Sequence, residues 1–130
     1  MKKCMVLTAL LLVMCGGQAA TRSLSPQVLM VKLSPDEAKQ LCDWLAGLYG
    51  GYGKAVACDG GSEGDGPTDQ ASCVSGYMQA EAKYPTCPVT VGQFQACQQW
   101  RMQNMCVAYP PPSSPPDGCA IISSSLCSTG

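Results

Sequence analysis

The sequence predicts a small disulfide-rich domain that is mostly α-helical, with about three helices joined by Gly- and Pro-rich loops. Three observations support this fold class. The chain of 130 residues begins with the features of an export signal, eight cysteines follow that signal, and three segments space their apolar residues as a helix does. Residues 21–33 are assigned to an N-terminal segment, and residues 34–130 to the disulfide-rich helical domain.

Residues 1–20 have the layout of an export signal peptide. Two lysines precede an apolar run, and the small residues Gly16, Gly17, Ala19 and Ala20 follow it, where a signal peptidase would cut. The apolar run is about a dozen residues, shorter than the roughly 20 that a membrane-spanning helix needs, so no transmembrane span is expected. The alternative is a lipobox ending at Cys15, although Met14 departs from that motif. We therefore expect a secreted or periplasmic protein, or a lipoprotein anchored to a membrane through Cys15.

The first helix is predicted over about Pro35 to Tyr49. Ser34 and Glu37 form an S-x-x-E capping box at its start. Gly50 and Gly51 supply the positive φ angles at which a helix ends. One apolar stripe runs along this helix: Ala38, Leu41, Cys42, Leu45, Leu48 and Tyr49.

A Gly-rich acidic loop, residues 59–67, leads to the second helix. This loop lacks two of the ligands that a calcium-binding EF-hand loop requires, so we expect a solvated surface loop. The second helix is predicted to begin near Thr68 or Asp69 and to end near Lys83, two residues before a proline. Gly76 lies inside this helix and lowers its helix propensity.

The third helix is predicted over about Val91 to Met105. It follows the T-x-x-Q capping box that Thr90 and Gln93 form. The proline-rich stretch Tyr109 to Pro116 then favours an extended spacer. A short turn or helical piece is expected between Cys119 and Cys127.

The cysteines that follow the signal are expected to form four disulfides, because their number is even and an exported protein meets an oxidising compartment. Their spacing provides neither the close pairs of a zinc site nor a C-x-x-C redox motif. They are Cys42, Cys58, Cys73, Cys87, Cys97, Cys106, Cys119 and Cys127.

Helix geometry restricts how these cysteines pair. Along a continuous third helix, Cys97 and Cys106 lie roughly 13 Å apart, beyond the limit of about 7 Å between the Cα atoms of a disulfide. Cys87 lies farther still from Cys106, so neither pair is expected. We expect Cys42–Cys97 between packed helices and Cys119–Cys127 as a local closure. The other four cysteines then pair as Cys58–Cys106 with Cys73–Cys87, or in the reverse arrangement.

Composition argues against catalysis and nucleic-acid binding. The chain contains no histidine, which excludes Ser-His-Asp and Cys-His nucleophiles and most catalytic zinc sites. The stretch GLYGGYGKA, residues 47–55, lacks the spacing and the hydroxyl of a phosphate-binding loop. Removing residues 1–20 leaves six basic and nine acidic residues without a basic patch, so nucleic acid is not an expected partner. We expect no enzymatic activity, no cofactor and no metal.

Several motifs together resemble small cysteine-rich exported proteins of myxobacteria, many of them uncharacterised or classed as candidate lipoproteins. The motifs are LCDWLAGLYGGYG, the cysteine after it, CPVTVGQFQAC and the spaced C-terminal cysteines. The resemblance covers about Ser34 to Cys127. It implies export and a helical disulfide-rich domain, and it implies no activity.

The sequence thus predicts an exported, disulfide-stabilised binding or structural module that is a monomer and meets an extracellular or cell-surface partner. One alternative is an inhibitor or toxin-like effector that presents Asp59–Pro67 or the proline-rich stretch. Another is a carrier of a small apolar ligand, in a cavity lined by Leu41, Leu45, Phe94 and Met105. Core packing is the competing explanation for those four side chains.

Overall fold

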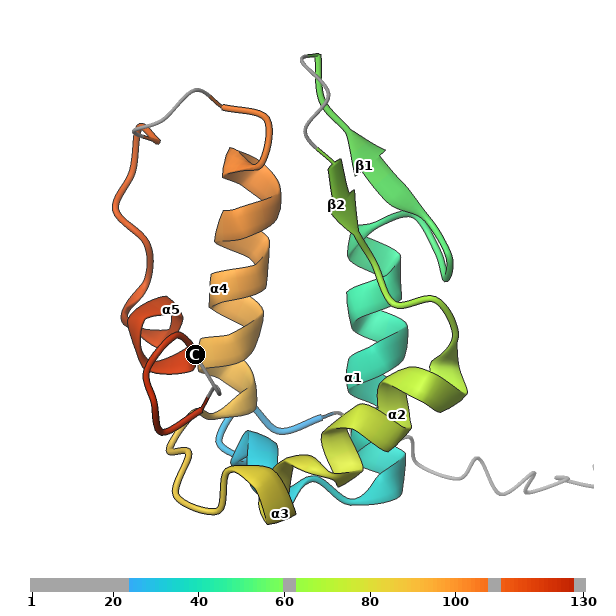
Figure 1. The fold of residues 1–130 in the computed structure, drawn as a ribbon, viewed down its shortest axis with the longest axis vertical. Helices are drawn as coiled ribbons and strands as arrows, with labels where there is room; N and C mark the ends of the chain where they lie inside the picture. The colour runs from blue at the N-terminus through green and yellow to red at the C-terminus, as the bar shows by residue number, and fades with distance from the viewer. Residues whose placement is uncertain (1–23, 60–62, 108–110, 128–130) are drawn as a thin grey trace, which may run out of the picture.

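The computed structural model describes residues 24–59, 63–107 and 111–127, so the export signal and Cys15 lie outside the described residues. Two long helices stand side by side (Figure 1): α1, Pro35–Leu48, and α4, Val91–Asn104. The shorter elements are the 3-10 helix η1 (Met30–Lys32), the strands β1 (Ala55–Ala57) and β2 (Glu63–Asp65), and the helices α2 (Gln70–Met78), α3 (Ala80–Lys83) and α5 (Asp117–Ile122). The predicted fold class, a mostly helical disulfide-rich domain, is confirmed.

Both predicted capping boxes are present. The Ser34 N–H donates to the Glu37 carboxylate at 2.9 Å, and the Glu37 N–H donates back to the Ser34 hydroxyl at 3.3 Å. The Thr90 N–H donates to the Gln93 side-chain oxygen at 3.0 Å in the same way at the start of α4. These contacts satisfy N–H groups that a helix start leaves unpaired, which is why both helices begin where the sequence predicts.

The glycines after α1 end the helix as predicted. Gly50 has φ 84° and Gly51 has φ 130°, and the Gly51 N–H donates to the Ala46 carbonyl oxygen at 2.9 Å. Side chains disfavour such φ values, so the stretch after α1 is a helix stop and a turn.

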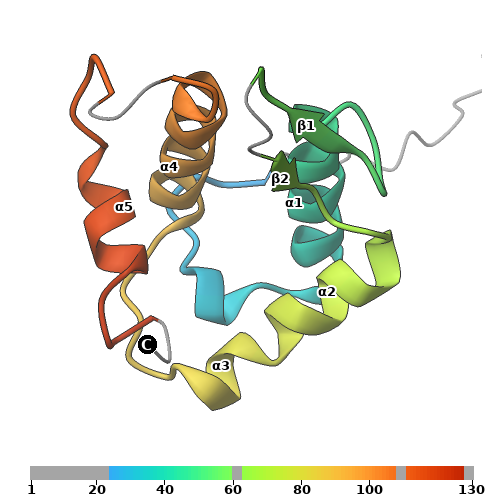
Figure 2. The same cartoon turned by 45° about the horizontal axis from the view of Figure 1, so that its top comes forward.

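The second predicted helix is divided into α2 and α3. The Asp69 carboxylate caps α2 by accepting the Ser72 N–H at 2.8 Å. The helices meet at Gln79, whose N–H bonds the Ser75 carbonyl oxygen and whose own carbonyl oxygen accepts the Lys83 N–H. Because backbone hydrogen bonds continue across the junction, α2 and α3 form one bent arm, which Figure 2 shows running below η1. We call residues 70–83 the α2–α3 arm.

Two elements were not predicted. An antiparallel hairpin pairs β1 with β2 in the register Ala55↔Asp65, and it takes up part of the predicted acidic loop. The helix η1 lies in the segment before α1 and bonds to the chain before α4: the Met30 N–H donates to the Val89 carbonyl oxygen at 2.8 Å. The short helix α5 occupies part of the region where a turn or helical piece was expected.

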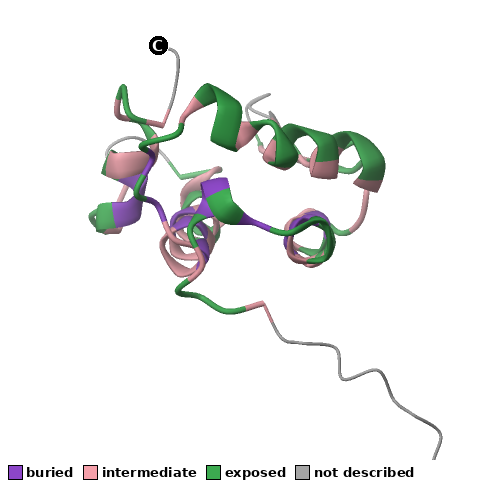
Figure 3. Ribbon diagram, turned by 90° about the horizontal axis from the view of Figure 1, so that it is seen from below, coloured by how far each residue is buried: buried purple, intermediate pink, exposed green. Residues whose placement is uncertain are grey.

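The core lies around η1, between the lower parts of α1 and α4. In Figure 3 the buried positions gather there, whereas α2 and α3 contain no buried residue. The buried core side chains are Met30, Val31, Leu33, Ala38, Leu41, Cys87, Val89, Val91 and Phe94. The segment before Ser34 therefore contributes three residues to the core, and the α2–α3 arm covers it only in part.

Four disulfides link the elements, but the pairing differs from the expected one. The bridges are Cys42–Cys73, Cys58–Cys106, Cys87–Cys127 and Cys97–Cys119, with Cα atoms 6.0, 5.2, 4.9 and 5.1 Å apart. Of the expected pairs only Cys58–Cys106 forms, and the two pairs excluded by helix geometry are absent. The predictions Cys42–Cys97, Cys119–Cys127 and Cys73–Cys87 were wrong. The reverse arrangement, Cys58–Cys87 with Cys73–Cys106, was wrong as well.

The reason lies in which helix packs on which. Cys42 and Cys97 are both fully buried, but α2 packs against α1 and α5 packs against α4. Each buried cysteine therefore meets the short helix beside it. α5 carries Cys119 to α4, and the chain that follows returns Cys127 to Cys87.

No helix among the described residues has both the length and the hydropathy that crossing a bilayer requires.

Candidate functional site

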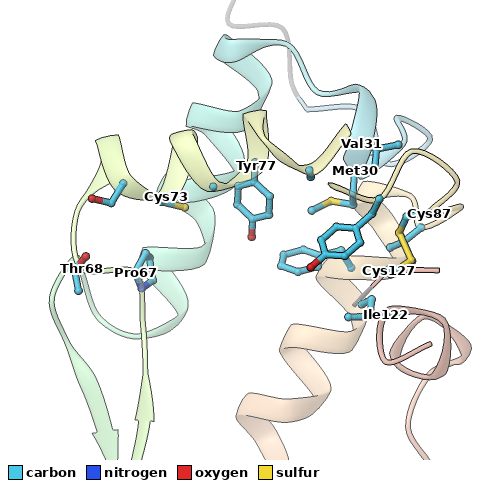
Figure 4. A pocket seen from close by; sticks show the side chains of 15 residues that line it. Met30, Val31, Pro67, Thr68, Cys73, Tyr77, Cys87, Ile122 and Cys127 are labelled. Carbon is cyan, nitrogen blue, oxygen red and sulfur yellow. A yellow bond between two sulfur atoms is a disulfide. The ribbon is translucent and has the colours of Figure 1, made fainter. Parts of the chain in front are cut away.

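A hollow of about 490 Å³ opens between the α2–α3 arm and the helices α4 and α5. We call it the central pocket (Figure 4). Met30 and Val31 of η1 line it next to the core, and Pro67 and Thr68 lie at its end beside the hairpin. Cys73, Gly76, Tyr77 and Ala80 supply the wall on the arm, while Phe94, Ile122 and the Cys87–Cys127 disulfide supply the opposite wall.

Disulfides hold both walls in place. Cys73 lines the pocket and bonds Cys42 in the buried face of α1, which fixes α2 against that helix. Cys87 and Cys127 line the pocket as well, and their bridge fixes the chain after α5 beside the core. The cross-links limit how closely the two walls can approach each other. The hollow is therefore largely pre-formed, as small-molecule sites usually are.

The lining is apolar and carries no charge. Among its described residues there is no lysine, arginine, aspartate or glutamate. The nearby ion pair of Lys32 and Glu81 joins η1 to α3, but both side chains are more than half exposed and neither lines the pocket. A ligand would therefore meet hydrocarbon, aromatic rings and a few hydroxyl groups.

Tyr77 presents a hydroxyl to this apolar space. Its ring packs edge-to-face on Phe94, with centroids 5.9 Å apart and planes at 85°. Figure 4 shows the ring standing out from α2 with its hydroxyl directed into the hollow. No hydrogen bond to this hydroxyl occurs among the described residues, and burial raises the pKa of Tyr77 above its ordinary value. The group is therefore a neutral donor and acceptor that remains available to a ligand.

The other hydroxyls at the hairpin end of the pocket are already engaged. Thr68 and Ser72 both donate to the Asp69 carboxylate, at 3.3 and 2.9 Å. The Ser72 backbone N–H that caps α2, together with these hydroxyl bonds, lowers the pKa of Asp69. This end of the pocket is organised as a helix cap.

The four residues proposed from sequence for a carrier cavity do not surround one cavity. Phe94 lines the central pocket, but Leu41 is fully buried in the core and Leu45 is half-buried against it. Met105 lines a separate hollow of about 310 Å³ beside Trp100. The competing explanation, core packing, holds for Leu41 and Phe94, which both belong to the core, and for Leu45, which packs against it.

Sequence reasoning missed the arm as a pocket wall, although a signal was present. Cys73, Tyr77, Ala80 and Tyr84 recur at intervals of four, three and four residues, which is the apolar stripe of a helix. All four line the pocket. The stripe identifies the face, but it does not tell whether another layer covers that face.

The loops proposed for an inhibitor have structural partners. Asp65 belongs to β2, and the Pro67 carbonyl oxygen accepts the Gly53 N–H at 2.9 Å. The indole N–H of Trp100 donates to the Ser113 hydroxyl at 3.0 Å and so fastens the proline-rich stretch to α4. Within the described ranges, no group of acidic residues or cysteines is arranged to hold a metal ion.

A polar cluster around Asp43 ties three segments together on the surface. The Tyr52 hydroxyl donates to the Asp43 carboxylate at 2.7 Å, and the Gln70 amide donates to the same oxygen. These bonds lower the pKa of Asp43, and burial together with the bond to Asp43 raises the pKa of Tyr52 to about 12. The cluster joins α1, the turn before the hairpin and the start of α2, so we assign it a structural role.

No protein-family model matches the chain, and neither a curated protein nor a solved structure shows detectable similarity to it. The pocket itself is therefore the basis for inferring a function.

Proposed function

We propose that the protein is an exported binding module that takes a small apolar ligand in the central pocket. The observation that supports this proposal is a hollow of about 490 Å³ with an uncharged, largely apolar lining. Small-molecule sites are typically concave, apolar and about 300 to 1,000 Å³ in volume. Removing apolar surface from water contributes roughly 25 cal/mol per Å², so filling the hollow is favourable for an apolar molecule.

A purely structural module accounts less well for the pocket. The fully buried side chains Leu41, Val89 and Val91 form a packed core beside it. The arm, in contrast, packs Tyr77 and Ala80 against this core but leaves both side chains only half-buried. Apolar side chains that stay half-exposed to water contribute less to stability than they would if they were fully buried. A ligand that fills the hollow would recover that difference.

Export is part of this proposal. It is supported by the four disulfides, which persist mainly in oxidising compartments, and by the signal-like residues 1–20. We expect N-terminal mass spectrometry of the exported protein to find a chain that starts at Ala20 or Thr21, or a diacylated Cys15 if the lipobox is used. An intact Met1 would contradict both routes.

Filling the pocket from the arm tests the binding function. Gly76 lies in α2 and lines the pocket, and a Cβ added there meets no atom within 4 Å, so phenylalanine can be accommodated. We expect the neutral fluorescent probe N-phenyl-1-naphthylamine to bind the wild type saturably with 1:1 stoichiometry. Gly76→Phe should weaken binding about tenfold or more, because a ring occupies ligand volume. Fluorescence titration measures both affinities.

Gly47→Phe is the matched control. Gly47 lies in α1, is exposed, meets no atom within 4 Å of an added Cβ, and does not line the pocket. This variant should bind the probe as the wild type does. Equal affinities of Gly76→Phe and the wild type would contradict the proposal, as would the absence of saturable binding. A molecular mass that rises with protein concentration would mean that a second copy covers the pocket.

A further inference from the structure

We propose that the ligand of the central pocket is an uncharged molecule with an aromatic or branched aliphatic body and one hydroxyl or carbonyl group, which hydrogen-bonds to the Tyr77 hydroxyl. This inference rests on the proposed function and names the chemical class that the pocket selects.

The exclusion of charge follows from the lining. An anionic or cationic group entering the pocket would lose its water and meet no charged side chain among the described lining residues. Burying a charge without a partner is strongly unfavourable. The Lys32–Glu81 pair offers no compensation, because the two charges satisfy one another at the surface.

The start of α2 does not offer an anion site either. A helix N-terminus attracts negative charge through its free N–H groups. At this helix the Asp69 carboxylate already accepts the Ser72 N–H, at 2.8 Å, and the hydroxyls of Ser72 and Thr68. A ligand carboxylate placed there would meet a carboxylate of the protein, which disfavours acids such as fatty acids.

Tyr77 fixes the position of the ligand's polar group. Its ring is held against Phe94, so the hydroxyl has a defined place on the arm wall. Every described side-chain oxygen that is fully buried has a hydrogen-bond partner. The Tyr77 hydroxyl has no such partner, so it is not fully buried and faces accessible space in the pocket. It can donate to a carbonyl or accept from a hydroxyl. The rings of Tyr77 and Phe94 together offer edges and faces to an aromatic body.

Three probes with the same ring body test this selection: naphthalene, 1-naphthol and 1-naphthoate. Each is used to displace N-phenyl-1-naphthylamine from the wild type and from Tyr77→Phe, which keeps the ring and removes the hydroxyl. On the wild type we expect 1-naphthol to bind about three- to tenfold more tightly than naphthalene, the effect of one net hydrogen bond. We expect 1-naphthoate to bind at least about tenfold more weakly than 1-naphthol, because its charge must be desolvated.

In Tyr77→Phe the advantage of 1-naphthol over naphthalene should disappear, while naphthalene binds as it does to the wild type. Tyr52→Phe is the control, since it makes the same chemical change at a hydroxyl that bonds Asp43 and does not line the pocket. It should leave the preference unchanged, and loss of the preference there would overturn the assignment to Tyr77. Thermal unfolding checks that both variants fold, and if Tyr77→Phe does not, the three probes on the wild type still test the ligand class.

The two proposals fail in different ways. If neither naphthalene nor N-phenyl-1-naphthylamine binds, the apolar pocket has no binding function and the proposed function falls. If naphthalene binds but 1-naphthol has no advantage, or 1-naphthoate binds equally well, the proposed function stands and the inference about ligand class is overturned.

Discussion

Replacing Cys42 and Cys73 together with alanine is expected to lower the free energy of unfolding by about 3 to 4 kcal/mol and to weaken probe binding in the central pocket. The bridge closes a loop of 31 residues, and the chain-entropy model assigns about this stabilisation to a loop of that length. The helix α2 contains no buried residue of its own. The bridge to the fully buried Cys42 is therefore a main reason why the arm stays on α1.

The measurement is urea unfolding followed by circular dichroism, together with titration of N-phenyl-1-naphthylamine under native conditions. Loss of the bridge frees the arm wall, so affinity should fall even where the domain remains folded. Unchanged affinity in a folded, less stable variant would show that the arm keeps its place without the cross-link.

The Cys58–Cys106 bridge supplies the matched control. It closes a longer loop of 48 residues, so replacing both cysteines with alanine should destabilise the domain by a similar or slightly larger amount. This bridge joins the chain after β1 to the chain after α4, and neither cysteine lines the pocket. We expect this variant to lose stability and keep its affinity for the probe. The pair of variants thus separates a general loss of stability from a loss of the pocket wall.

The long helices could be predicted because their determinants are local. The capping pairs Ser34–Glu37 and Thr90–Gln93 and the glycines after α1 act within a few residues of one another along the chain. The hairpin could not, because each strand has only three residues and its stability depends on pairing across the turn. Periodicity over so short a stretch carries too little information.

Most of the disulfide pairing could not be predicted from the sequence, for a different reason. Periodicity showed that Cys42 and Cys97 face inward, but not which neighbour each one meets. That depends on how α2 crosses α1 and how α5 crosses α4. Length along a helix could exclude pairs, and the two pairs so excluded are absent, whereas choosing the correct partners needed the packing of short helices.

The pocket was unpredictable on the same ground. The stripe from Cys73 to Tyr84 marks an apolar face of the arm, and such a face is usually covered. Whether it is covered depends on the position of the arm relative to Phe94 and Ile122, which come from other parts of the chain. Residues proposed from their own helix alone, such as Leu41, were therefore assigned to a cavity when they fill the core.

Gly118→Ala is expected to lower the free energy of unfolding by about 2 to 3 kcal/mol, at the upper end of the usual cost of adding a methyl group to a packed interior. Gly118 is buried at the start of α5, and an added Cβ would lie 2.6 Å from the Gln93 carbonyl oxygen and 2.9 Å from the Gln93 Cβ. Both atoms belong to Gln93 of α4 and are fixed to its backbone, so they cannot move aside unless the helix moves. The adjacent Cys97–Cys119 bridge also prevents α5 from moving away.

Urea unfolding measures this loss as a lower midpoint with an unchanged slope. Gly76→Ala is the control: an added Cβ at Gly76 meets no atom within 4 Å, so the same substitution should raise stability by about 0.5 to 1 kcal/mol through helix propensity. Opposite signs for one chemical change would establish that the close contact, and not the loss of glycine, destabilises the domain. A Gly118→Ala variant as stable as the wild type would mean that α5 does not lie this close to α4. Since Ile122 of α5 lines the central pocket, a shift of α5 should also lower the affinity for the probe, which makes this helix contact part of the pocket's construction.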